Sequence, residues 1–96
     1  MNENILDVKK WNYGEYSNDN YGANTIAIKL GNRTVYYSYN TVVAFSGKNS
    51  LGEEFDCISE NIWGPTTGKH LNFINPDKKA RLPRKEFENK LQEFLK

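Results

Sequence analysis

Residues 25–45 read TIAIKLGNRTVYYSYNTVVAF and predict three strands joined by short turns. Apolar and polar side chains alternate over residues 25–30, as they do in a strand with one buried face. Gly31-Asn32 fits a two-residue hairpin turn. Residues 33–39 then return as a second strand, and residues 42–45 form a third after an Asn-Thr turn or bulge. This stretch therefore predicts an antiparallel sheet.

The rest of the chain extends the sheet and adds one helix. Residues 55–63 predict a fourth strand and residues 70–74, HLNFI, a fifth, while residues 46–54 read as a polar loop. Apolar residues recur at i, i+4, i+7 and i+8 within 83–95, which is the spacing of a helix with one apolar face. We expect an α+β fold: a small curved antiparallel sheet of about five strands packed by one C-terminal helix.

The composition indicates one small domain. Ninety-six residues suffice for one modest core. We expect an aromatic-rich N-terminal segment at 1–22, the sheet within 23–74 and the helix at 83–95. A single cysteine excludes an intrachain disulfide framework, and the N-terminus lacks the pattern of a signal peptide. No apolar stretch reaches the roughly 20 residues that span a bilayer, so we expect a cytoplasmic protein.

Residues 61–72, NIWGPTTGKHLN, contain a near-match to a phosphate-binding motif. A P-loop reads G-x-x-x-x-G-K-[ST]. Here three residues, not four, separate Gly64 from Gly68, and His70 stands where the motif needs a hydroxyl residue for magnesium. With 70–74 predicted as a strand, no helix would follow. A nucleotide-hydrolysing P-loop is therefore rejected.

The same segment still concentrates hydrogen-bond donors. Glycines, hydroxyls, an ammonium and an imidazole within a few residues can present convergent donors to an anion. The candidate ligand-binding residues are Trp63, Thr66, Thr67, Gly68, Lys69, His70 and Asn72. The alternative is a turn between two strands, with the threonines bonded to their own backbone and Trp63 in the core.

We do not expect an enzyme. His70 is the only histidine, and a histidine base needs a nucleophile and an orienting group nearby. Cys57 lies in a strand pattern, where buried inert thiols are common. One histidine and one cysteine are too few for a usual zinc site. We therefore expect no catalytic residue, no metal and no cofactor.

Two further groups of residues suggest other ligands. Tyr36 and Tyr39 could form a stacking platform for bases, or they could belong to the core with a wet hydroxyl. Five basic residues within 77–85 accompany one acidic residue, Asp77, and could bind nucleic acid or form a solvated turn and helix start. These are Lys78, Lys79, Arg81, Arg84 and Lys85.

Three stretches together resemble a known group of sequences: NYGAN (20–24), VYYSYNTVVAF (35–45) and ENIWGPTTGKHLNFI (60–74). The chain is similar, over roughly residues 13–95, to a family of small uncharacterised phage and prophage proteins with a W-G-x-T-T-G-K-H-L-N loop. The resemblance implies a phage accessory protein acting in the cytoplasm of a bacterial host. It implies no established activity.

Our leading hypothesis is a non-enzymatic module that binds an anionic, nucleotide-like ligand through the WGPTTGKH loop. By analogy with other small phage proteins, such binding would counter host defence. One alternative is an inhibitor or adaptor that binds a host protein through an aromatic or sheet-edge surface. Another is nucleic-acid binding through the 77–85 patch. No membrane partner is expected, and the oligomeric state stays open.

Overall fold

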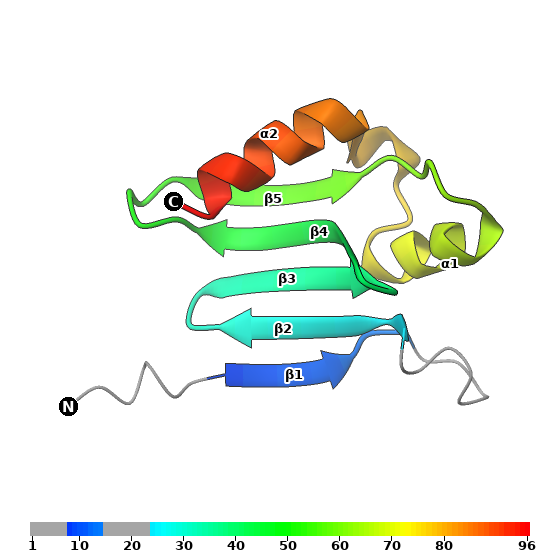
Figure 1. Cartoon of the computed structure of the whole chain (residues 1–96), viewed down its shortest axis with the longest axis horizontal. Coiled ribbons are helices and arrows are strands. Elements are labelled where there is room, and N and C mark those ends of the chain that lie inside the picture. Colours follow the sequence, from blue (N-terminus) through cyan, green and yellow to red (C-terminus); the bar gives the residue numbers. More distant parts are fainter. Residues whose placement is uncertain (1–7, 15–23) are drawn as a thin grey trace.

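The fold is an open sheet with a helix packed on each face (Figure 1). The computed structural model describes residues 8–14 and 24–96. Within them, six strands follow one another in the order β1-β2-β3-β4-β5-β6. The strands are β1 (Val8–Asn12), β2 (Ile26–Leu30), β3 (Arg33–Ser38), β4 (Thr41–Lys48), β5 (Glu54–Ser59) and β6 (Arg81–Leu82), and the helical segments are α1 (Pro65–Ile74), the 3₁₀ turn η3 (Lys78–Ala80) and α2 (Arg84–Phe94).

The first five strands form an antiparallel meander. Gly31 and Asn32 join β2 to β3, as the sequence predicts, and Tyr39 and Asn40 join β3 to β4. Only β6 pairs in parallel, with β5, because the chain between them makes a crossover through α1 and η3. The predicted α+β class, with a sheet packed by a C-terminal helix, is confirmed.

A bulge in β4 changes which side chains point to each face. Tyr36 pairs with Ala44, but Tyr37 pairs with Val42, so Val43 is an extra residue in the ladder. Successive side chains of a regular strand point to opposite faces. Because of the bulge, Val43 and Ala44 instead join the same cluster, beneath α1.

Three phenylalanines hold α2 against the other face. Phe45, Phe87 and Phe94 are almost completely buried, and the ring centroid of Phe45 lies 5.1 Å from that of Phe87 and 4.6 Å from that of Phe94. Aromatic pairs at such distances contribute about 0.5–1.5 kcal/mol beyond their buried area. The apolar spacing within 83–95 predicted the helix, and Phe87 and Phe94 dock as expected, whereas Leu95 lies exposed beyond the end of α2.

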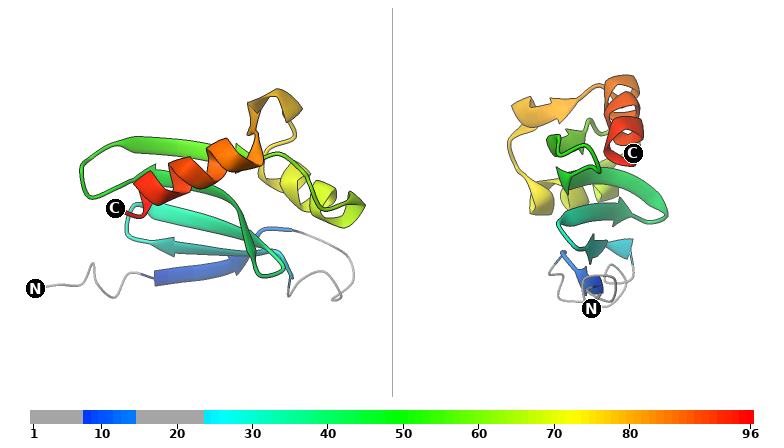
Figure 2. Two further views of the ribbon diagram at one scale, coloured as in Figure 1. Left: turned by 45° about the horizontal axis from the view of Figure 1, so that its top comes forward. Right: turned by 90° about the vertical axis from the view of Figure 1, so that its left-hand side faces the viewer.

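The shorter helix α1 packs on the opposite face, near the end of the sheet where β3 stops and β4 starts (Figure 2). Its Leu71 is fully buried against Val43 and Ile58. Ile74 packs against the same cluster. This contact places the N-terminus of α1 beside the turn between β3 and β4.

The strand predicted at residues 70–74 is wrong, because these residues complete α1. Pro65 favours the first turn of a helix, and helical spacing then turns both His70 and Leu71 toward the sheet. A short apolar run does not by itself distinguish a strand from a helix. The extended conformation of Asn75 ahead of Pro76 ends the helix.

Other boundaries also differ from the prediction. The segment 1–22 contributes β1 to the sheet, and its Trp11 and Tyr13 place their rings edge-on to Tyr36 at centroid distances of 6.4 and 5.5 Å. Tyr16 and Tyr21 lie outside the described residues. Strand β4 continues to Lys48, through the start of the predicted polar loop, and β5 ends at Ser59 rather than at residue 63.

Candidate functional site

A pocket of about 380 Å³ lies between the β3–β4 turn and the N-terminus of α1. This volume is at the lower end of the range typical of small-molecule sites. Two half-exposed aromatic side chains, Tyr39 and Trp63, belong to its wall. The lining residues are Ser38, Tyr39, Thr41, Val43, Trp63, Gly64, Pro65, Thr66 and Thr67. We call this the turn–helix pocket.

Asn61 builds the entry to α1. Its side-chain oxygen accepts hydrogen bonds from the backbone N–H groups of Trp63 and Gly64, and its amide donates to the carbonyl of Gly64. Gly64 has a φ of 148°, which a residue with a side chain rarely adopts. Asn61 was not among the predicted site residues, although an asparagine two or three residues before such a turn is a recognisable signal.

The N-terminus of α1 adds hydrogen-bond donors to the pocket. The first N–H groups of a helix have no partner within it, and Pro65 has no N–H to offer. The free donors at this end are therefore the backbone groups of Thr66 and Thr67, next to their own hydroxyls. The partial positive charge of a helix N-terminus also favours an anion here.

Tyr39 holds a strained backbone conformation at the pocket. It is the one residue other than glycine with positive φ in the described part of the chain, at 56°. Such a conformation in a bulky residue is uncommon and costs about 1–3 kcal/mol. Tyr39 is 47% exposed, and its ring centroid lies 5.6 Å from that of His70.

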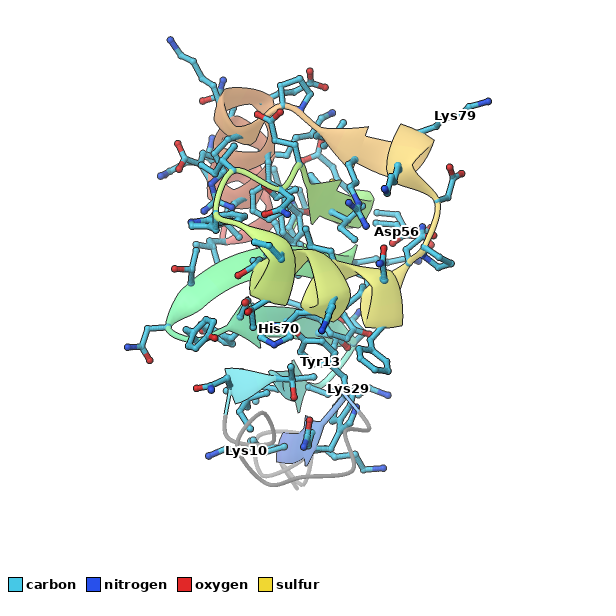
Figure 3. The ribbon with its side chains drawn as sticks, turned by 90° about the vertical axis from the view of Figure 1, so that its right-hand side faces the viewer. Lys10, Tyr13, Lys29, Asp56, His70 and Lys79 are labelled. Carbon is cyan, nitrogen blue, oxygen red and sulfur yellow. The ribbon has the colours of Figure 1, made fainter. Side chains whose placement is uncertain are left out.

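A buried hydrogen-bonded group forms the floor of the pocket. The Ser38 hydroxyl lies 2.7 Å from His70 Nδ1 and 3.0 Å from the Thr67 hydroxyl. His70 is fully buried and Ser38 nearly so. Burial holds the pKa of His70 below its ordinary value of 6.5, so the neutral ring is favoured at neutral pH. We call these three residues the polar brace, and Figure 3 shows His70 between α1 and the sheet.

The brace includes the atoms of a serine–histidine pair, but its geometry favours a structural role. A serine nucleophile must reach a substrate carbon through its hydroxyl. The Ser38 side chain is only 2% exposed, and its hydroxyl is already held by two partners. Because β3 carries Ser38 and α1 carries both other members, the brace fixes α1 against the sheet.

Arg84 supports Trp63 from behind the pocket. Its guanidinium lies 5.0 Å from the Trp63 ring centroid and 4.8 Å from that of Phe87. One of its N–H groups donates to the carbonyl of Val42 at 3.0 Å, and Glu88 forms an i,i+4 ion pair with it. Trp63 is therefore held in place by a cation–π contact. It is 40% exposed, so it is not buried in the core.

The family to which this chain belongs follows from comparison with known sequences. A family model described as a family of unknown function (DUF8033) matches residues 8–89. The chain belongs to the DUF8033 family. No curated protein and no solved structure matches it. The match includes every residue that lines the turn–helix pocket and all three members of the polar brace.

The structure of this DUF8033 member places the predicted ligand-binding residues at four locations. Trp63, Thr66 and Thr67 line the pocket, while His70 lies beneath it in the brace. Gly68 faces Asn61, whose amide nitrogen would lie 3.0 Å from an added Cβ. Two residues lie elsewhere on the surface: Lys69 is exposed and Asn72 accepts a hydrogen bond from Arg81.

The two tyrosines predicted as a stacking platform are also separated. Tyr39 lines the pocket. Tyr36 lies within the sheet on the α1 side, where burial and then the nearby charge of Asp56 raise the pKa of its hydroxyl. These two rings therefore do not form one surface.

The predicted basic patch loses two of its five members to internal contacts. Arg84 is held by Trp63, Phe87 and Glu88, and Arg81 bonds Asn72. Lys78, Lys79 and Lys85 remain exposed. In the part of the chain that the structure describes, no three metal-ligating side chains converge, and neither helix has the length and apolar character needed to cross a bilayer.

Proposed function

We propose that the turn–helix pocket binds a small nucleotide-like ligand, an aromatic ring carrying an anionic group, without chemical conversion. The observation that carries this proposal is the lining of one pocket by two half-exposed aromatic side chains and by the N-terminus of a helix. Aromatic rings offer a stacking surface for a base. Free backbone N–H groups at a helix N-terminus offer a site for a phosphate.

The roles of individual residues differ from those expected from sequence. Tyr39 and Trp63 would hold the ring, and the hydroxyl and backbone of Thr66 would bind the phosphate. Lys69 does not line the pocket, so its charge acts only through solvent and is partly screened. Arg84 does not line the pocket either, and its part would be to hold Trp63 through the cation–π contact.

A conservative pair of variants at Tyr39 tests the pocket. Tyr39→Phe keeps the ring, whereas Tyr39→Asn removes it and still tolerates positive φ. Stacking on an aromatic residue contributes about 1–3 kcal/mol, so Tyr39→Asn should weaken binding by about 5- to 150-fold. The measurement is isothermal titration with adenosine and guanosine 5′-monophosphates, after mass spectrometry of any small molecule released from the denatured protein.

Thr66→Val provides the second arm, since it removes the hydroxyl while keeping the shape of the side chain. Thr67 is unsuitable for this purpose, because its hydroxyl belongs to the polar brace and its loss would affect folding. If Tyr39→Asn and Thr66→Val both bind as the wild type does, the pocket is not the nucleotide site.

One further observation favours a protein partner as the second candidate. Ile62 is 58% exposed next to Trp63, and a nucleotide has no need of such an apolar neighbour. Exposed aromatic side chains beside an apolar one are typical anchors of protein interfaces. The resemblance to phage proteins adds the proposal that the partner comes from a bacterial host and that binding counters host defence. Recovery of one stoichiometric host protein, lost on Ile62→Asp, would favour this function over the first.

A further inference from the structure

The β1–β2 ladder places two lysines directly opposite each other. Lys9 pairs with Lys29 in the antiparallel register, and both are exposed. Like charges at directly opposite positions destabilise a sheet. In the described part of the chain, neither lysine forms an ion pair. As far as residues 8–14 and 24–96 show, the pair therefore presents two positive charges without an acidic partner in one cross-strand contact.

An aromatic ring lies on the same face as this pair. Trp11 follows Lys9 by two residues, so both side chains point to the same side of the sheet. The Trp11 ring is half-buried and meets Tyr36 edge-on, at an interplanar angle of 84°. A surface hollow of about 630 Å³ is lined by Lys9, Lys10, Trp11 and Lys29.

Alternation of side chains separates Lys10 from the other two lysines. Lys10 pairs with Ile28, whose side chain points to the α2 side of the sheet. In Figure 3, Lys10 and Lys29 accordingly project to opposite sides. The surface that combines charge with an aromatic ring is formed by Lys9, Trp11 and Lys29, and we call it the β1–β2 face.

Protection of an exposed sheet edge explains only part of this arrangement. Natural edge strands carry lysines that discourage pairing with other chains, and β1 is at the end of the strand order. That reason suits Lys9 and Lys10. It does not suit Lys29, which lies on the interior strand β2, nor the presence of Trp11 on the same face.

We propose that the β1–β2 face binds single-stranded nucleic acid, with Lys9 and Lys29 contacting successive phosphates and Trp11 stacking on a base. A row of cations beside an aromatic ring is the usual composition of such surfaces. Stacking on Trp11 requires an unpaired base, so a duplex lacks half of the interaction. This site is separate from the turn–helix pocket and from the 77–85 patch.

The test uses the full chain with the substitution Trp63→Phe, which leaves Trp11 as the single tryptophan. A fluorescein-labelled 12-nucleotide oligothymidylate is titrated with this protein and followed by anisotropy, and unlabelled oligonucleotide is followed by Trp11 fluorescence. Two phosphate contacts predict affinity about sevenfold lower in 200 mM than in 50 mM salt. Stacking predicts quenching of Trp11 as the oligonucleotide binds.

Two double variants with equal charge changes decide the location. Lys9→Thr with Lys29→Thr should remove most of the salt dependence and weaken binding at 50 mM salt at least about tenfold. Lys90→Ala with Lys96→Ala, both exposed in or just after the C-terminal end of α2, should bind as the parent does. A melting temperature equal to or above the parent's confirms that the fold of the threonine variant is intact, because the substitution removes a like-charge pair and threonine suits strands.

Four results would overturn the proposal. The first three are no binding at 50 mM salt, equal loss in the α2 control, and binding without any change in Trp11 fluorescence. An equally tight complex with the duplex of the same sequence would likewise refute it, since it would show attraction to phosphate alone. Loss of nucleotide binding in the turn–helix pocket has no bearing on any of these outcomes.

Discussion

Replacing Ser38 with alanine should destabilise the protein by about 2–3 kcal/mol. The substitution removes hydrogen bonds to His70 Nδ1 and to the Thr67 hydroxyl, both in the buried brace. A buried polar group left without its partner costs about 1–3 kcal/mol. The cost arises at both His70 and Thr67, because each loses a buried hydrogen-bond partner.

The measurement is the free energy of unfolding from urea titration, together with the melting temperature. For a domain of this size, 1 kcal/mol corresponds to about 4–8 °C, so the melting temperature should fall by about 10–20 °C. Ser46→Ala is the matched control, since it makes the same substitution in a half-exposed position of β4. It should change stability by less than about 0.5 kcal/mol. If Ser38→Ala proves as stable as Ser46→Ala, the brace does not hold α1 on the sheet.

Three further predictions concern the fold. Burial lowers the pKa of His70 in the folded protein, so the unfolded chain takes up a proton more readily than the folded one. The free energy of unfolding should therefore fall as the pH drops from 6.5 toward the lower pKa of the folded state. The slope should be at most about 1.4 kcal/mol per pH unit. His70→Asn, measured by urea titration at several pH values, should remove this part of the slope, and an unchanged slope would assign it to other groups. Gly47→Ala should lower the melting temperature strongly, because φ at Gly47 is 122° and the added methyl would collide with the carbonyl oxygen of Asn32. A variant that melts as the wild type does would contradict this close approach of β4 to the β2–β3 turn. Phe45→Ala should cost about 3–5 kcal/mol in urea unfolding, since its ring touches both phenylalanines of α2, and a cost below 1 kcal/mol would show that α2 packs elsewhere.

Local patterns predicted the parts of this fold that depend on neighbouring residues. Alternation in 25–30 and the Gly31-Asn32 turn predicted the β2–β3 hairpin, and helical spacing in 83–95 predicted α2 with its docking face. Both signals come from residues a few positions apart. The α1 segment was misassigned because HLNFI is equally compatible with either structure until its packing against Val43 is known.

The candidate site depends on contacts that no local pattern contains. Ser38 and His70 are 32 positions apart in the sequence, and a serine in a strand carries no sign of a distant partner. The sequence predicted that Arg84 belongs to a basic patch, whereas the structure places its guanidinium against the Trp63 ring. Trp63, Thr66 and Thr67 were identified in advance because an unusual local composition accompanied them, whereas Lys69 shared that composition and yet lies outside the pocket.

The positive φ of Tyr39 costs stability, so this conformation needs a reason, either in packing or in binding. Asparagine at position 39 would relieve the backbone strain, at the loss of a ring that is already half-exposed. If Tyr39 serves the ligand, Tyr39→Asn should therefore be at least as stable as the wild type while binding less. A clear loss of stability would instead assign the ring to packing over His70, and the strain would then have a structural cause.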